Sequence, residues 1–243
     1  MRVDYSRLAA DYDDVRGDED SDRRFWLPAL RDVGLLRAGD RILEIGSGTG
    51  RYARLLAESA RVVALDASRS MLERARGKGP FERVLGDAHR LPFRDDSFDA
   101  AVAVMVLHQL DDFRAALREA VRVADRVAIA TTDIARRDLG ILAEAFPSLL
   151  AIDGRRFPSV PDIVAALEGA GCVDVRTTNR SMHRTLPVST QLDRVRRKYI
   201  STLQLIPAEE FGSGLEFLER ELPRRYGRIF AFESEFTFVG ASR

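Results

Sequence analysis

The sequence predicts an α/β fold in which a mostly parallel sheet is covered by helices on both faces. Five apolar runs of strand length recur along the chain, at residues 42–45, 61–66, 81–85, 100–107 and 126–131. Stretches with apolar residues at helical spacing separate these runs. The first run ends in a glycine-rich turn with the spacing GxGxG. Alternation of strands and helices, with a glycine turn after the first strand, is typical of open parallel sheets that bind a ligand at their carboxyl edge.

Bulk composition favours one cytoplasmic α/β domain. The chain has 243 residues, and its 38 lysines and arginines equal its 38 aspartates and glutamates, so the net charge argues against non-specific nucleic-acid binding. No apolar stretch approaches the length of a membrane span, and the amino-terminal residues do not resemble a signal peptide. One cysteine, Cys172, rules out an internal disulfide and a cysteine-based zinc cluster.

Residues 41–50 are expected to form a strand, a tight turn and the start of a helix, which brings backbone N–H groups close to a ligand. The dinucleotide-binding pattern GxGxxG would need glycine at position 51, where this chain has Arg51. This spacing disfavours an NAD-dependent oxidoreductase. Glu44 lies inside the strand, where a carboxylate is costly without a partner. It therefore suggests a cofactor with positive charge or many donors.

The stretch EIGSGTG, from Glu44 to Gly50, resembles the first motif of class I S-adenosylmethionine-dependent methyltransferases. The closest group comprises ubiquinone/menaquinone C-methyltransferases and small-molecule methyltransferases. The resemblance covers roughly residues 5–180 and the final strand. It implies a Rossmann-like, seven-stranded, mostly parallel sheet with an antiparallel last strand and helical lid insertions. It also implies S-adenosylmethionine as cofactor and S-adenosylhomocysteine as product.

Two further acids match the cofactor site of this family. Asp66 ends the second strand, where such folds hold ribose hydroxyls, although it could instead cap the helix that follows. Asp87 lies in a GDA turn that the resemblance places near the adenine amino group; the alternative is an ordinary turn aspartate. The expected cofactor-binding residues are Glu44, Gly46, Ser47, Gly48, Thr49, Gly50, Asp66, Ala67, Met71, Asp87, Ala88 and Met105.

His108 is the first candidate for a general base, because it follows the fourth strand, whose end lies beside the reaction centre. A structural role is the alternative, since a leucine–histidine pair is common here in the family. His183, after the sixth strand, is the second candidate. Residues 104–107 read VMVL rather than (N/D)PP(Y/F), which disfavours DNA or amide-nitrogen methylation. No metal is expected, because the acids after strands four and five are as easily helix caps.

Three variable stretches are expected to face the acceptor. An amino-terminal lid would contribute Tyr12 and Arg16. A basic helix over residues 190–200 would contribute Arg197 and Tyr199 and, with Arg155 and Arg156, could bind an anionic group. A solvated helix face is the alternative for the basic run.

These expectations define one methyltransferase domain, residues 1–243. Residues 1–36 would form the lid, 37–182 the cofactor-binding core, 183–230 a helical insertion over the acceptor, and 231–243 the final strand. The predicted function is methylation of a small-molecule acceptor at oxygen, with carbon and amine nitrogen open. Alternatives are methylation of a peptide or protein carboxylate, such as a peptide C-terminus, and a non-catalytic, cofactor-binding scaffold.

Overall fold

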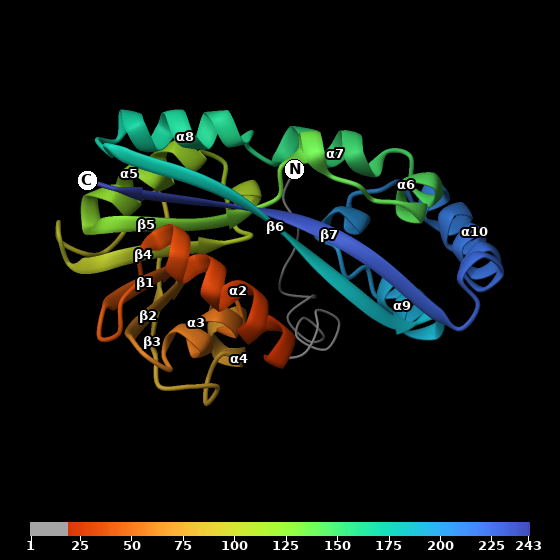
Figure 1. The fold of residues 1–243 in the computed structure, drawn as a ribbon, viewed down its shortest axis with the longest axis horizontal. Helices are drawn as coiled ribbons and strands as arrows, with labels where there is room; N and C mark the ends of the chain where they lie inside the picture. The colour runs from red at the N-terminus through yellow and green to blue at the C-terminus, as the bar shows by residue number, and fades with distance from the viewer. Residues whose placement is uncertain (1–18) are drawn as a thin grey trace.

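The computed structural model describes residues 19–243 and contains a seven-stranded sheet with the order β3-β2-β1-β4-β5-β7-β6 (Figure 1). The strands are β1 (Arg41–Ile45), β2 (Arg61–Asp66), β3 (Glu82–Leu85), β4 (Phe98–Val104), β5 (Ala124–Thr131), β6 (Asp174–Pro187) and β7 (Ile229–Ser242). Strands β1 to β5 run parallel, and β7 is antiparallel to both of its neighbours. The predicted fold class is therefore confirmed.

Helices cover both faces of the sheet (Figure 1). Helices α2 (Glu19–Gly34), α3 (Arg51–Leu56) and α4 (Arg69–Arg74) lie on one face, and α5 (Phe113–Val123) and α8 (Val160–Gly169) lie on the other. Strand β4 is buried on both sides, with Val102 in the core under α2 and Ala101 in the core under α5. This double burial explains why its sequence is continuously apolar.

Side chains cap several of the helices. The side chain of Asp112 accepts the N–H of Ala115 at the start of α5, and Ser159 accepts the N–H of Asp162 at the start of α8. Asp133 likewise caps η2 (Ile134–Arg136). Two of the acids after strands four and five therefore serve the backbone.

Strands β6 and β7 form a ribbon that is longer than predicted. Alternation typical of a strand extends only over residues 173–178 and 232–239 of the sequence, whereas each strand has 14 residues. Only the half of β7 from Thr237 to Ser242 pairs with β5. The other half continues past the carboxyl end of β5 toward a group of helices (Figure 1).

This helical group, which we call the cap, comprises α6, α7, α9, η3 and α10. Its elements are α6 (Ile141–Ala145), α7 (Leu149–Arg156), α9 (Val188–Arg196), η3 (Ser201–Gln204) and α10 (Ala208–Tyr226). The cap has its own hydrophobic core, in which Phe146, Leu149 and Leu218 are fully buried. It therefore includes the connection after β5 as well as the expected insertion, and residue 183 lies within β6. None of the helices in residues 19–243 is both long and apolar enough to cross a membrane.

The close approach of α2 to β7 makes Gly240 a sensitive position. A Cβ atom there would lie 1.7 Å from the carbonyl oxygen of Val33. We expect Gly240→Ala to lower the free energy of unfolding by about 1–3 kcal/mol, because overpacking displaces the backbone. Urea unfolding measures this effect. Gly212→Ala, in α10 with open space around it, is the control and should be neutral or stabilising. Equal stability of both variants would contradict the packing.

Candidate functional site

The glycine turn between β1 and α3 has a left-handed backbone at each glycine. Its φ angles are 69° at Gly46, 54° at Gly48 and 77° at Gly50. A Cβ at Gly46 would lie 2.2 Å from Val106, and one at Gly50 would lie 2.6 Å from Phe81. Nothing lies within 4 Å of the corresponding point at Gly48. Packing therefore requires the outer two glycines, whereas the middle one leaves open space for a ligand.

The Glu44 carboxyl group is buried beneath this turn. The residue is 1% exposed, and its carboxyl group accepts a hydrogen bond from the backbone N–H of Ala53 in α3. Its Oε2 atom has no hydrogen-bond partner among the described residues, and neither does the buried Oγ of Ser47. Burial, and secondarily the Asp66 carboxylate, hold the pKa of Glu44 well above its ordinary value.

Asp66, at the end of β2, fastens the turn. Its Oδ2 accepts the N–H of Gly48 at 2.7 Å, and its Oδ1 accepts the N–H of Ser68 at 2.7 Å. Burial raises the pKa of Asp66, while these two hydrogen bonds oppose the shift. Ser68, not Asp66, supplies the side-chain cap of α4. Each oxygen of Asp66 retains a lone pair that could accept a ribose hydroxyl.

Asp87 lies after β3 and is held by His89. Its Oδ1 accepts the N–H of His89 at 2.9 Å and lies 2.6 Å from the ring Nδ1. The other ring nitrogen, Nε2, accepts the N–H of Asp112 at 3.3 Å. Because Nε2 accepts this bond, Nδ1 is the nitrogen that donates to Asp87, and His89 joins the turn to the start of α5. Met71 and Ala88 nearby are buried, whereas Ala67 is exposed.

These features fit S-adenosylmethionine. The spare acceptors of Asp66 suit the hydroxyl groups of a ligand, and Glu44 supports the turn from beneath. The open side of Gly48 lets the backbone approach the ligand closely. Residues 44–50, Asp66 and Asp87 could thus hold the cofactor along one edge of the sheet.

A cavity of about 560 Å³ lies beside this edge. Met105, His108 and Thr132 line it from the ends of β4 and β5, and residues of the cap line the opposite wall. Eight aromatic side chains of the described chain contribute to the lining: Trp26, Tyr52, Phe157, Tyr199, Tyr226, Phe230, Phe232 and Phe236. The cavity is large enough for a small organic molecule.

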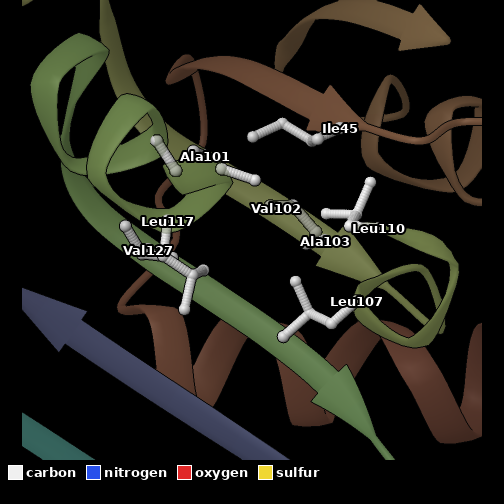
Figure 2. A pocket seen from close by; sticks show the side chains of 10 residues that line it. Ile45, Ala101, Val102, Ala103, Leu107, Leu110, Leu117 and Val127 are labelled. Atoms are coloured by element: carbon white, nitrogen blue, oxygen red, sulfur yellow. The ribbon is translucent and has the colours of Figure 1, made fainter. Parts of the chain in front are cut away.

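A second hollow lies in the core between β4 and α5 and has a volume of about 10 Å³. Figure 2 shows that only apolar side chains line it, including Ile45, Ala101 and Leu117. An apolar void of this size holds no ligand and stays dry. Of these two hollows, only the larger has room for a ligand.

The candidate base His108 lies in η1 (Leu107–Gln109), directly after β4. Its ring stacks on Phe157 of the cap, with ring centres 4.0 Å apart and planes 8° from parallel. Met105, three residues earlier, has a left-handed backbone, with φ of 51°. This turn at the strand end lets both side chains line the same cavity.

Arg51, at the position where the dinucleotide pattern needs glycine, forms a forked ion pair with Asp22 of α2. The two distances are 2.5 Å and 2.6 Å, and both side chains are buried. Arg184 of β6 lies 4.0 Å from the same carboxylate. Arg51 and Arg184 both line the cavity, so Asp22 joins the glycine turn to the ribbon.

Some of the predicted acceptor residues line the cavity and others do not. Tyr199 lines the cavity, and its hydroxyl accepts a hydrogen bond from Gln191 at 3.3 Å. Arg194 also lines it, 4.2 Å from the Tyr199 ring centre. Arg197 is exposed and does not line the cavity. His183 is 77% exposed, 3.8 Å from Glu233, and also lies outside the lining.

Tyr12 and Arg16 lie outside the described residues. Of the other two arginines considered for anion binding, Arg155 is exposed on α7, whereas the Arg156 side chain is 6% exposed. Sequence reasoning missed Arg137, which lines the cavity and pairs with the fully buried Asp153. The adjacent arginines after the fifth strand, residues 136 and 137, were the only local signal.

The chain is similar to known methyltransferases. Residues 43–129 match a family described as a methyltransferase domain. The chain is 43% identical over 101 residues to the demethylmenaquinone methyltransferase of Mycobacterium marinum, covering 41% of this chain and 43% of that relative. It is 31% identical over 179 residues to the protein of that name from Mycolicibacterium vanbaalenii, covering 64% and 78% respectively.

A solved structure supports the fold alone. The crystal structure of a methyltransferase from an antibiotic biosynthesis pathway of Anabaena variabilis superposes with a TM-score of 0.70 at 22% identity. The superposition covers 88% of this chain and 95% of that protein. By contrast, the first sequence match spans less than half of its relative's length.

The buried Glu44 makes a prediction about pH. The folded chain retains a proton that the unfolded chain loses above its pKa near 4.5, so stability falls as pH rises from there through the raised pKa of Glu44. Glu44→Gln should reduce this loss in the cofactor-free protein. Denaturant unfolding at pH 5 and pH 8 measures it. Glu82→Gln, exposed in β3, is the control. Identical pH profiles for wild type and Glu44→Gln would contradict the shift.

Proposed function

Because this chain belongs to the class I S-adenosylmethionine-dependent methyltransferases, we propose that it transfers the cofactor's methyl group to a hydroxyl oxygen of a small molecule. The observation that carries the proposal is the position of the 560 Å³ cavity. Its lining includes Arg51 and Tyr52, which directly follow the glycine turn, and Met105 and His108 at the end of β4. An acceptor in this cavity would lie next to the cofactor-binding edge.

When bound, the cofactor supplies an electrophilic methyl group on a sulfonium sulfur. The protein's task is then to align the acceptor and to keep water out, and such alignment can lower a barrier by about 7–11 kcal/mol. Aromatic side chains on both the sheet side and the cap side enclose the acceptor space, including Trp26 of α2, Tyr52 of α3 and Tyr226 of α10. The ribbon and the cap would hold the acceptor against the sheet edge.

His108 is the proposed base that takes the hydroxyl proton of the acceptor. Its ring lines the cavity, and stacking on Phe157 fixes the ring plane. A general base speeds the reaction when the acceptor must lose a proton. Histidine can take a hydroxyl proton near neutral pH, because its ordinary pKa lies in that range. His183 has no part in this proposal, since it lies outside the cavity lining.

We expect His108→Ala to lower kcat by about 10²- to 10⁴-fold with cofactor affinity unchanged, because only proton removal is lost. The assay follows transfer of isotopically labelled methyl from S-adenosylmethionine to a panel of phenols and hydroxy acids. His183→Ala is the control and should retain full activity. Unaltered turnover by His108→Ala would remove His108 as the base. Cofactor binding without transfer to any acceptor would favour a non-catalytic scaffold.

A further inference from the structure

Arg137 presents a partly paired guanidinium to the cavity. It follows η2, lines the cavity and is 15% exposed. Its Nη1 pairs with the carboxylate of Asp153, which also accepts the hydroxyl of Thr202. Its Nε and Nη2 have no hydrogen-bond partner among the described residues. Asp153 therefore fixes the guanidinium while leaving two of its nitrogen atoms available to a ligand.

The cluster around Asp153 carries a surplus positive charge. Arg156 is a second guanidinium, with Nη1 3.8 Å from the Asp153 carboxylate. Its hydrogen-bond acceptors are neutral: Thr202 at 2.9 Å, Ser201 at 3.3 Å and Gln109 at 3.1 Å. One carboxylate thus faces two guanidinium groups. A buried cation without a full counter-charge is costly, and a ligand anion would offset that cost.

The charges elsewhere on the cavity wall leave this surplus in place. Arg136 pairs with Glu235 at 3.0 Å or less, and Arg51 pairs with Asp22. Asp138 also lines the wall, and its Oδ1 accepts the N–H of Gly140 at 2.7 Å, which holds the loop. Within residues 19–243, five arginines and three acids line the cavity, namely Arg51, Arg136, Arg137, Arg184 and Arg194 against Asp138, Glu233 and Glu235. Asp22 and Asp153 lie behind this wall and pair with two of these arginines, so that, with Arg156, six guanidinium groups face five carboxylates.

Arg137 and His108 also contact one and the same ring. The guanidinium carbon of Arg137 lies 5.7 Å from the centre of Phe157, and His108 stacks on that ring at 4.0 Å. Resting on the proposed function, we propose that the acceptor is a planar hydroxy acid whose carboxylate binds Arg137 while its hydroxyl faces His108. The aromatic lining suits a planar molecule. A single surplus charge matches a monoanion better than a doubly charged phosphate.

Calorimetric titration tests the proposal with 4-hydroxybenzoate and its neutral analogue 4-hydroxybenzamide, both added to the complex with S-adenosylhomocysteine. Wild type should bind the carboxylate at least about tenfold more tightly than the amide, as expected for charge-assisted hydrogen bonds. Arg137→Gln should abolish this preference. Arg155→Gln is the control and should keep it, because Arg155 is exposed on α7 and does not line the cavity. Equal binding of the two probes by wild type, or an unchanged preference in Arg137→Gln, would overturn the proposal.

The experiment separates this inference from the proposed function. Carboxylate preference without methyl transfer to any acceptor would refute the transfer and keep the anion site. Transfer to neutral phenols without carboxylate preference would support the methyl transfer and refute the anion site. If Arg137→Gln fails to fold, the double variant Arg137→Gln with Asp153→Asn is used in place of the single variant. It removes both charges of the buried pair, so no unpaired carboxylate remains there. Phenyl phosphate binding more tightly than the benzoate would overturn the monoanion assignment.

Discussion

The buried carboxyl group of Glu44 is the constraint on which the part of the molecule around the glycine turn depends. It lies where the strand order reverses, since β1 pairs with β2 on one side and with β4 on the other. Open α/β sheets bind ligands at such a point. Leaving one carboxyl oxygen buried without a partner costs roughly 1–3 kcal/mol. The glycine turn and the Asp66 hydrogen bond to Gly48 are arranged around this group, so the fold retains an unfavourable feature where a ligand can relieve it.

The cap is stabilised by a hydrophobic core of its own. Its core of side chains such as Phe146, Leu149 and Leu218 does not extend into either core of the sheet. The ribbon of β6 and β7 joins the two parts, and the Asp22–Arg51 pair secures α2 against the glycine turn. The cavity therefore has one wall set by the sheet edge and another set by the cap. Residues on the cap wall can determine the acceptor without changing the packing beneath the cofactor turn.

Local patterns in the sequence predicted the sheet and the glycine turn and allowed the helix caps found at Asp112 and Asp133. Each depends on neighbours within a few positions, such as the spacing of apolar residues or an acid two or three residues before the N–H that it accepts. The pairing of Arg137 with Asp153 was not predictable, because it joins a loop to a helix 16 residues later with no periodic signal. Likewise, no pattern in the sequence near Arg51 predicts its ion pair with Asp22, which lies 29 residues away. The outward position of His183 follows from the register of a strand whose length was underestimated.

The central claim is that residues 44–50 and Asp66 bind S-adenosylmethionine rather than a dinucleotide. Calorimetric titration of the folded protein with S-adenosylmethionine, S-adenosylhomocysteine and NADH tests it most directly. We expect one-site binding of the two adenosyl ligands and no heat of binding for NADH, because Arg51 occupies the place of the third glycine. Failure of both adenosyl ligands to bind, or binding of NADH in competition with them, would contradict it.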